Sequence, residues 1–162
     1  PIIVLIISTL AIGTAFVAEN YFNILPCKMC LYQRYPYYFI IIFSVIFIVL
    51  KNIPLTLYCW ITTLSFTVGL FFSTWHVGIE QKILPGLPGC SIDISKSQSL
   101  SKLKDQIINQ NITTCDEITW SFFGISAATL NSVLLIILLL INVKLLILNY
   151  YNKEKNIKIK NK

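Results

Sequence analysis

Residues 122–143 read FFGISAATLNSVLLIILLLINV, and this stretch contains no Asp, Glu, Lys or Arg. A helix needs about 20 apolar residues to cross the roughly 30 Å hydrocarbon core of a bilayer, so the stretch is long enough to span a membrane. Three similar apolar runs precede it, at residues 1–18, 31–50 and 55–75. The pattern predicts an all-α integral membrane protein, a four-transmembrane-helix bundle. We expect the first run to be a membrane helix and not a signal-peptide core, because it has no basic start and no clear cleavage site.

The composition agrees with a single membrane domain over residues 1–162 and argues against a nucleic-acid-binding protein. Hydrophobic residues make up 56% of the chain and charged residues 12%, which are too few to coat an ordinary soluble domain. The net charge is +6, but six of the thirteen Lys and Arg residues lie from Lys144 onward, and no basic stripe is interleaved with aromatic residues. We therefore expect contact with membrane lipid and no nucleic-acid partner.

The Lys-rich C-terminal segment predicts the orientation in the membrane. Residues 144–162 carry the strongest positive cluster, which the positive-inside rule places in the cytoplasm. With four crossings, the N-terminus is also cytoplasmic, and the loops 19–30 and 76–121 share the outer face. Apolar residues at helical spacing within 95–108 are compatible both with a short amphipathic helix on the membrane surface and with an irregular solvated loop.

Five cysteines are present, and four of them lie in the two outer loops or at their edges. Cys59 is in the middle of the third apolar run, where a free thiol behaves as a small hydrophobic side chain, so we expect a structural role for it. The topology brings Cys27, Cys30, Cys90 and Cys115 to one side of the membrane. That side is the oxidising one, where thiols become disulfides.

The Cys27-x-x-Cys30 pair is compatible with a redox pair, half of a zinc site or a simple staple. A zinc site lacks a compact second half, because Cys90 and Cys115 are far apart in the sequence, and a haem attachment lacks the required His at position 31. Taken alone, a Cys90–Cys115 bond is typical of a structural staple and would stabilise the loop by roughly 3–4 kcal/mol. Cys27 and Cys30 enclose too few residues for such a gain, which favours electron transfer.

The position of Cys30 at the expected start of the second helix favours a reactive thiolate there. Helix-terminal N–H groups stabilise negative charge, and Arg34 follows four residues later, so it adds a positive charge nearby. Pro36 prefers the first turn of a helix, which allows the helix to begin nearer Arg34. Arg34 is also compatible with a simple anchor that reaches the lipid head groups.

His76 and Glu80 are spaced by four residues at the outer end of the third helix. Polar groups at this depth are able to hydrogen-bond a quinone carbonyl or pass the two protons that quinone reduction consumes. They are equally compatible with ordinary polar residues of the membrane interface.

Several motifs together resemble the disulfide bond formation protein B (DsbB) family. The stretch 26–37, PCKMCLYQRYPY, looks like the first-loop signature of that family. The resemblance continues with HVGIE at 76–80, a Gly- and Pro-rich approach to Cys90, then Cys115, and WSFFG at 120–124. It spans nearly the whole chain and leaves only the loop between Cys90 and Cys115 unmatched residue by residue.

The resemblance implies a membrane enzyme of the bacterial inner membrane that oxidises a periplasmic partner. In the family, a second-loop disulfide, here Cys90–Cys115, takes electrons from the thioredoxin-fold oxidase DsbA, with Cys90 attacked first. The first-loop pair then reoxidises it, with Cys27 as the exchanging partner towards the second loop. The reduction potential of DsbA is about −120 mV, so glutathione cannot reoxidise it, whereas a respiratory quinone can.

The resemblance also implies a quinone site, for ubiquinone or menaquinone. Cys30 would form a thiolate–quinone charge-transfer adduct, Arg34 and His76 would border the ring, and Glu80 would lie at its edge. Two other classes remain as alternatives. A vitamin K epoxide reductase-like enzyme would carry its Cys-x-x-Cys near the last core helix. A tetraspanin-like four-span scaffold with a stapled outer loop would lack a Cys-x-x-Cys at the membrane edge, and this chain lacks the Cys-Cys-Gly run typical of that group.

Overall fold

The computed structural model confirms the expected fold, with four helices that are long and apolar enough to cross a membrane. The structure describes residues 1–50, 52–87, 90, 114–118 and 120–160. In this part of the chain the only strands form a short antiparallel hairpin before the last helix. The elements in chain order are α1 (Ile2–Tyr21), α2 (Lys28–Leu50), α3 (Leu55–Glu80), β1 (Ser121–Phe122), β2 (Ile125–Ser126) and α5 (Ala127–Lys160).

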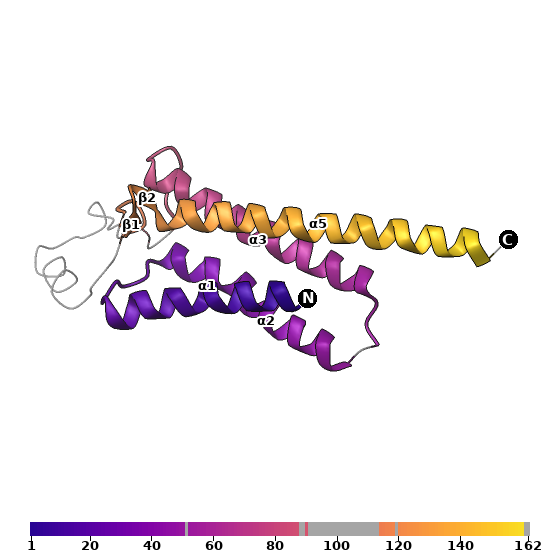
Figure 1. The fold of residues 1–162 in the computed structure, drawn as a ribbon. Coiled ribbons are helices and arrows are strands. Elements are labelled where there is room, and N and C mark those ends of the chain that lie inside the picture. The colour runs from indigo at the N-terminus through magenta and orange to yellow at the C-terminus, as the bar shows by residue number, and fades with distance from the viewer. Residues whose placement is uncertain (51, 88–89, 91–113, 119, 161–162) are drawn as a thin grey trace, which may run out of the picture.

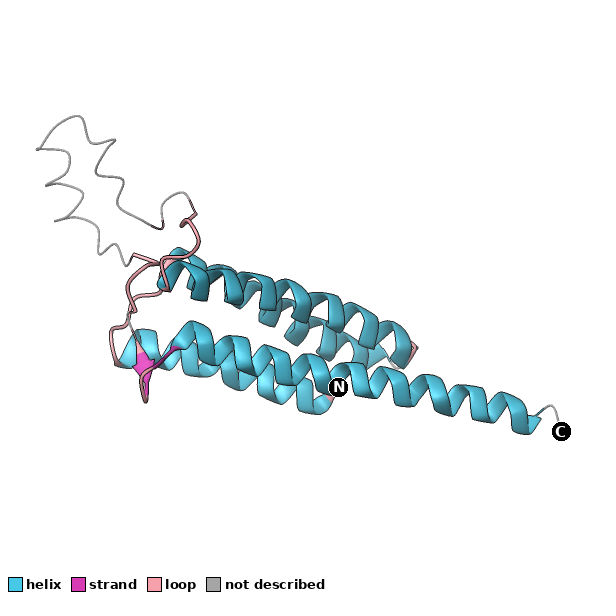
Figure 2. Ribbon diagram, turned by 90° about the horizontal axis from the view of Figure 1, so that it is seen from above, coloured by secondary structure: helices cyan, strands magenta, loops and turns pink. Residues whose placement is uncertain are grey.

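The helices form a bundle in which α3 packs against both α5 and α2, while α1 packs against α2 (Figure 1). The α1–α2 connection, the C-terminal end of α3 and the β1–β2 hairpin lie at one end of the bundle (Figures 1 and 2). The α2–α3 connection lies at the opposite end, and α5 extends beyond it. Every cysteine-bearing connection that the structure describes is therefore at the same end.

Apolar side chains fill the inside of the bundle and also cover much of its outer surface, as expected when lipid rather than water surrounds the helices. The inward faces form a buried apolar core, whereas long apolar side chains such as Leu140 and Ile147 on α5 are exposed, at 63% and 62%. Exposed aliphatic side chains in this number are typical of a surface that contacts lipid. The core residues are Val4, Ile12, Tyr37, Ile40, Phe66, Leu135 and Leu138.

Close approach between α2 and α3 depends on a glycine opposite a proline. A Cβ placed at Gly69 would lie 3.3 Å from Cβ of Pro36. Pro36 is buried inside α2, and its carbonyl accepts a hydrogen bond from Ser65 Oγ at 3.3 Å. α2 begins at Lys28, well before Pro36, so the alternative of a helix start nearer Arg34 is wrong. A proline inside a membrane helix is tolerated where a neighbouring helix supplies polar contacts.

Several helix boundaries differ from those expected. The second helix begins at Lys28 instead of residue 31, and the third continues to Glu80 instead of ending at residue 75. The last helix begins at Ala127, because Phe123 (φ 52°) and Gly124 (φ 81°) form the hairpin turn, and it continues to Lys160 through most of the expected tail. The amphipathic helix considered for residues 95–108 lies outside the described residues.

Cys59 has the buried position expected of a structural thiol. Its side chain is fully buried within α3, and its carbonyl accepts a hydrogen bond from Asn142 Nδ2 of α5 at 2.9 Å. Asn142 also donates to Thr62 Oγ1. Such polar contacts hold helices together in a membrane, where the separated groups would have no water to bond.

Candidate redox site

Cys27 is the residue that caps the N-terminus of α2. Its carbonyl accepts the first helical hydrogen bond, from Leu31 N at 3.2 Å, and its Sγ accepts a bond from Cys30 N at 3.3 Å. The sulfur therefore takes the place of the oxygen of a conventional N-cap residue. One turn of helix brings the two sulfur atoms to 3.0 Å from each other, unbonded but in position to form a disulfide.

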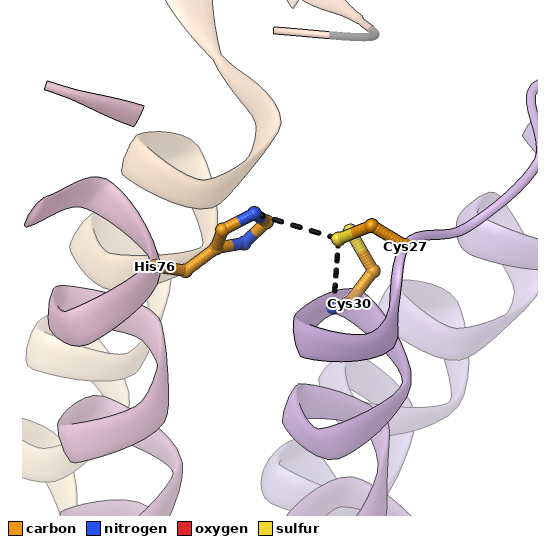
Figure 3. Close-up of side chains that lie close together, drawn as sticks. All are labelled: Cys27, Cys30 and His76. Atoms are coloured by element: carbon orange, nitrogen blue, oxygen red, sulfur yellow. Dashed lines mark hydrogen bonds between the residues drawn. The ribbon is translucent and has the colours of Figure 1, made fainter. Parts of the chain in front are cut away.

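His76 of α3 points at this pair from across the bundle (Figure 3). Its Nε2 is 3.5 Å from Cys27 Sγ, and its Nδ1 is 2.9 Å from Nε2 of Gln33 on α2. The imidazole is only 4% exposed. The extension of α3 past residue 75 is what carries this histidine to the sulfur.

These contacts stabilise a thiolate on Cys27. The hydrogen bond with the Cys30 thiol is the largest cause, and it lowers the pKa of Cys27 to about 4, with further contributions from His76 and the Cys30 N–H and with burial opposing them. The sequence-based expectation placed the thiolate on Cys30, on the assumption that Cys30 marks the helix start. The helix instead begins at Lys28, so the capping position belongs to Cys27, and a Cys30 thiolate beside the quinone stays a prediction.

The second cysteine pair is a disulfide that packs on the first pair. Cys90 and Cys115 are bonded, with their Cα atoms 5.0 Å apart, and Cys115 N donates to the carbonyl of Cys90 at 2.8 Å. Both are buried, at 1% and 0% exposure, in one cluster with Cys27, Met29 and Ile79. The pairing implied by the resemblance is therefore present, and three of the four cysteines are buried in one cluster against which the half-buried Cys30 packs.

Arg34 and Glu80 do not bond to this cluster. Arg34 donates to Glu19 Oε2 at 2.9 Å and lies over the Phe16 ring, so its charge is paired with α1. Glu80 accepts a hydrogen bond from Ser126 Oγ at 2.5 Å, which ties the end of α3 to the hairpin. Of the three polar residues selected from the sequence, only His76 contacts the cysteines in the part of the chain that the structure describes.

Glu19, Gln33 and Asn131 were missed by sequence reasoning. Gln33 and Asn131 form part of the polar contacts behind His76, and Glu19 is the partner of Arg34. Two signals were available: Glu19 is the only acidic residue before Glu80, and Asn131 interrupts a long apolar run. Polar residues inside a membrane segment are expensive and often functional, which is the argument that would have selected both.

The site contains three potential metal ligands. The ligand atoms of Cys27, Cys30 and His76 lie within 4.8 Å of one another. A structural zinc site requires four protein ligands. Cys90 and Cys115 cannot complete the set while they are bonded to each other.

An aromatic surface lies beside the half-buried Cys30. The rings of Tyr32 and Phe72 stack with their centroids 5.9 Å apart, and Phe71 meets Trp75 edge to face at 5.4 Å. Phe72 and Trp75 also pack against the cluster that contains both cysteine pairs. Tyr32 and Phe71 are exposed on the outside of the bundle, at 42% and 54%, so this aromatic surface is open to lipid.

A four-span membrane protein with a thiolate-bearing Cys-x-x-Cys beside a second cysteine pair is a membrane-bound disulfide oxidoreductase. Comparison with known proteins narrows this class. The chain belongs to the DsbB family, because it matches the family described as "Disulfide bond formation protein DsbB" over residues 1–145. It is therefore a multi-pass membrane protein of disulfide bond formation.

Two curated relatives cover most of the chain. An uncharacterized protein of Rickettsia prowazekii (strain Madrid E), RP370, is 31% identical over 143 residues, which is 86% of this chain and 81% of that protein. The disulfide bond formation protein B of Psychrobacter sp. (strain PRwf-1) is 29% identical over 137 residues, 79% of this chain and 78% of that protein. No solved structure matches the chain.

Proposed function

We propose that this protein reoxidises a periplasmic DsbA-like dithiol oxidase and passes the electrons to a respiratory quinone. The observation that supports this most is the common cluster of the two cysteine pairs, Cys27/Cys30 and Cys90–Cys115. Thiol–disulfide exchange requires a thiolate to reach a disulfide sulfur, so electrons move quickly only between pairs that are close in space. A scaffold with a simple staple has no need of that proximity.

The electron path conserves two electrons and two protons at each exchange. The partner dithiol reduces the Cys90–Cys115 disulfide and leaves oxidised, with its own disulfide formed. The Cys90/Cys115 dithiol then reduces the Cys27–Cys30 disulfide and becomes a disulfide again. The Cys27/Cys30 dithiol finally loses two electrons and two protons to the quinone, which supplies the oxidising power when bound.

The low pKa of Cys27 supports the downhill direction of this path. A thiolate stabilised by hydrogen bonds makes the dithiol form more stable relative to the disulfide, and that raises the reduction potential of the pair. A strongly oxidising Cys27–Cys30 pair is required if the electrons come from a partner as oxidising as DsbA. The same contacts would be of no use to a structural staple.

The aromatic surface beside Cys30 fits a quinone headgroup. Flat rings such as Tyr32 and Phe72 stack on flat ligands, and the surface is open to the lipid in which ubiquinone and menaquinone dissolve. Cys30 would meet the ring, His76 would border it from the cysteine side, and Arg34 would supply positive charge. Glu80, which bonds Ser126, would take a place at the edge of the site only if that bond opens.

The proposal places the cysteine end of the bundle in the periplasm. The described part of the Lys-rich segment, residues 144–160, lies at the opposite end from the β1–β2 hairpin (Figure 1). The positive-inside rule assigns that basic end, and the N-terminus, to the cytoplasm. The cysteines would then face an oxidising compartment from the bacterial inner membrane.

Turnover with a defined partner and quinone tests the proposal. The purified protein is mixed with a reduced DsbA-like oxidase and a short-chain ubiquinone or menaquinone, and quinone loss is followed by absorbance. We expect one quinone reduced per partner disulfide formed, no turnover in Cys27→Ala, and full turnover in the buried control Cys59→Ala. Absence of turnover in the unmodified protein, or turnover in Cys27→Ala, would contradict the proposal.

Trapping of the partner identifies the entry point of the electrons. Cys115→Ser, mixed with a partner that lacks its own resolving cysteine, is expected to form a mixed disulfide at Cys90, identified by mass mapping. A mixed disulfide on Cys115 in Cys90→Ser, with none on Cys90 in Cys115→Ser, would reverse the assignment. The alternative of a simple staple predicts no partner adduct in either variant.

A further inference from the structure

A chain of side-chain hydrogen bonds runs from the middle of the bundle to the cysteine pair. Tyr37 Oη donates to Asn131 Oδ1 at 2.7 Å, and Asn131 Nδ2 donates to Gln33 Oε1 at 2.8 Å. Gln33 Nε2 then lies 2.9 Å from His76 Nδ1, and His76 Nε2 lies 3.5 Å from Cys27 Sγ. The chain joins α2, α5 and α3 and ends on the sulfur with the lowered pKa.

The direction of each bond determines the next one. An amide NH₂ group can only donate, so Gln33 Nε2 must donate to His76 Nδ1, and that nitrogen must be without a proton. The proton of a neutral imidazole is then on Nε2, the nitrogen that faces Cys27. We propose that Gln33 and Asn131 are positioning residues that hold His76 in this tautomer, so that its ring donates a hydrogen bond to the sulfur of Cys27.

The opposite tautomer would require several groups to rearrange together. If His76 Nδ1 carried the proton, Gln33 would have to turn its amide so that the carbonyl faces Nδ1. The NH₂ group of Gln33 would then face the NH₂ group of Asn131, and neither can accept a hydrogen bond. Turning Asn131 as well would remove the acceptor of the Tyr37 hydroxyl. Gln33 and Tyr37 are buried, at 6% and 3% exposure, so groups left without partners would not find water.

Apart from the Cys27 thiolate, which faces Nε2 of His76, the charged groups near the site have other partners. Arg34 of α2 is paired with Glu19 of α1, and Glu80 of α3 accepts from Ser126. Among the described residues, the amide of Gln33 is thus the group that bonds Nδ1 of His76. Amides do not titrate at neutral pH, so this chain fixes the position of the imidazole proton without carrying the proton away.

This inference deepens the proposed function, because it names the residues that set the reactivity of the first cysteine pair. Its test needs neither quinone nor partner protein, so this inference and the proposed function can fail separately. His76 is the only histidine in the sequence, and ¹⁵N-histidine labelling of the reduced protein therefore gives a single pair of ring signals. We expect the proton on Nε2 in the unmodified protein at pH 7.

Substitutions of Gln33 make the test sharper. Gln33→Glu presents a carboxylate, which can only accept, and is expected to move the proton to Nδ1. Gln33→Met has a similar length and no hydrogen bond, and is expected to give a mixture of tautomers. A proton on Nδ1 or on both nitrogens in the unmodified protein, or no change in Gln33→Glu, would overturn the proposal.

A second position separates positioning from a general effect on folding. Asn131→Leu is expected to give the same mixture and to raise the pH midpoint of Cys27 alkylation by about 1, which is a tenfold loss of rate below the midpoint. The matched control is Asn149→Leu, because Asn149 also lies on α5 and donates to another helix, at Thr56 Oγ1. A midpoint that moves equally in both variants, or in neither, would contradict the role of Asn131.

Discussion

The pH dependence of Cys27 alkylation follows directly from the geometry of the cysteine pair. The contacts lower the pKa of Cys27 from an ordinary 9.0 to about 4, with the Cys30 thiol as the largest cause. A cysteine with a pKa of about 4 is almost fully ionised at both pH 6 and pH 8, so its rate with iodoacetamide should change by less than about twofold between them. An ordinary thiol would react roughly 90-fold faster at pH 8. Burial lowers the rate at every pH and leaves this ratio unchanged.

The assay uses the reduced protein in detergent, with the extent of modification at each cysteine measured by mass mapping. Cys30→Ala removes the largest cause and should move the midpoint of Cys27 upward, and His76→Phe should move it upward by less. The control Cys59→Ala changes a fully buried thiol away from the site and should leave the profile unaltered. A rate at Cys27 that rises more than about tenfold from pH 6 to pH 8 would refute the reasoning.

Three further outcomes are expected. Arg34→Met should weaken quinone binding, measured by fluorescence quenching, more than Lys28→Met does; equal effects would make Arg34 a simple anchor. A reporter active only in the periplasm should be active when fused after Lys82 and silent after Lys155, and the reverse pattern would overturn the orientation. Glu19→Gln should lower the free energy of unfolding by roughly 0.5–1 kcal/mol, because the ion pair between Glu19 and Arg34 is partly exposed. An unchanged free energy of unfolding, even at low salt, would show that the ion pair contributes nothing.

The fold was predictable because four apolar runs carry a strong signal in a chain of this length. Helix ends were less predictable, since they depend on single groups. Because Cys27 Sγ caps α2, the helix begins at Lys28, three residues before the predicted start, and the turn at Phe123 and Gly124 delays α5. Sequence periodicity contains no information about which side chain accepts the first free N–H groups of a helix.

The candidate site was predictable in its cysteines and only partly in its polar residues. The Cys-x-x-Cys spacing identifies the first pair, the topology brings Cys90 and Cys115 to the same side, and the family resemblance supplied the roles of the second pair and His76. Gln33 and Asn131 meet across the bundle from positions 98 residues apart, and such a contact exists only once the helices have packed. The ion pair of Arg34 was not predictable for the same reason, because its partner Glu19 lies on another helix.

The most direct test of the account is the fate of the four outer cysteines when quinone oxidises the fully reduced protein. The fully reduced protein, without partner, is mixed with two equivalents of quinone or with buffer, quenched with an alkylating reagent and mapped by mass. The account predicts that quinone protects all four cysteines in time, whereas in Cys30→Ser the Cys90/Cys115 pair remains alkylated because its electrons have no path onward. Reoxidation of Cys90–Cys115 by quinone in Cys30→Ser would contradict the transfer of electrons through Cys27 and Cys30.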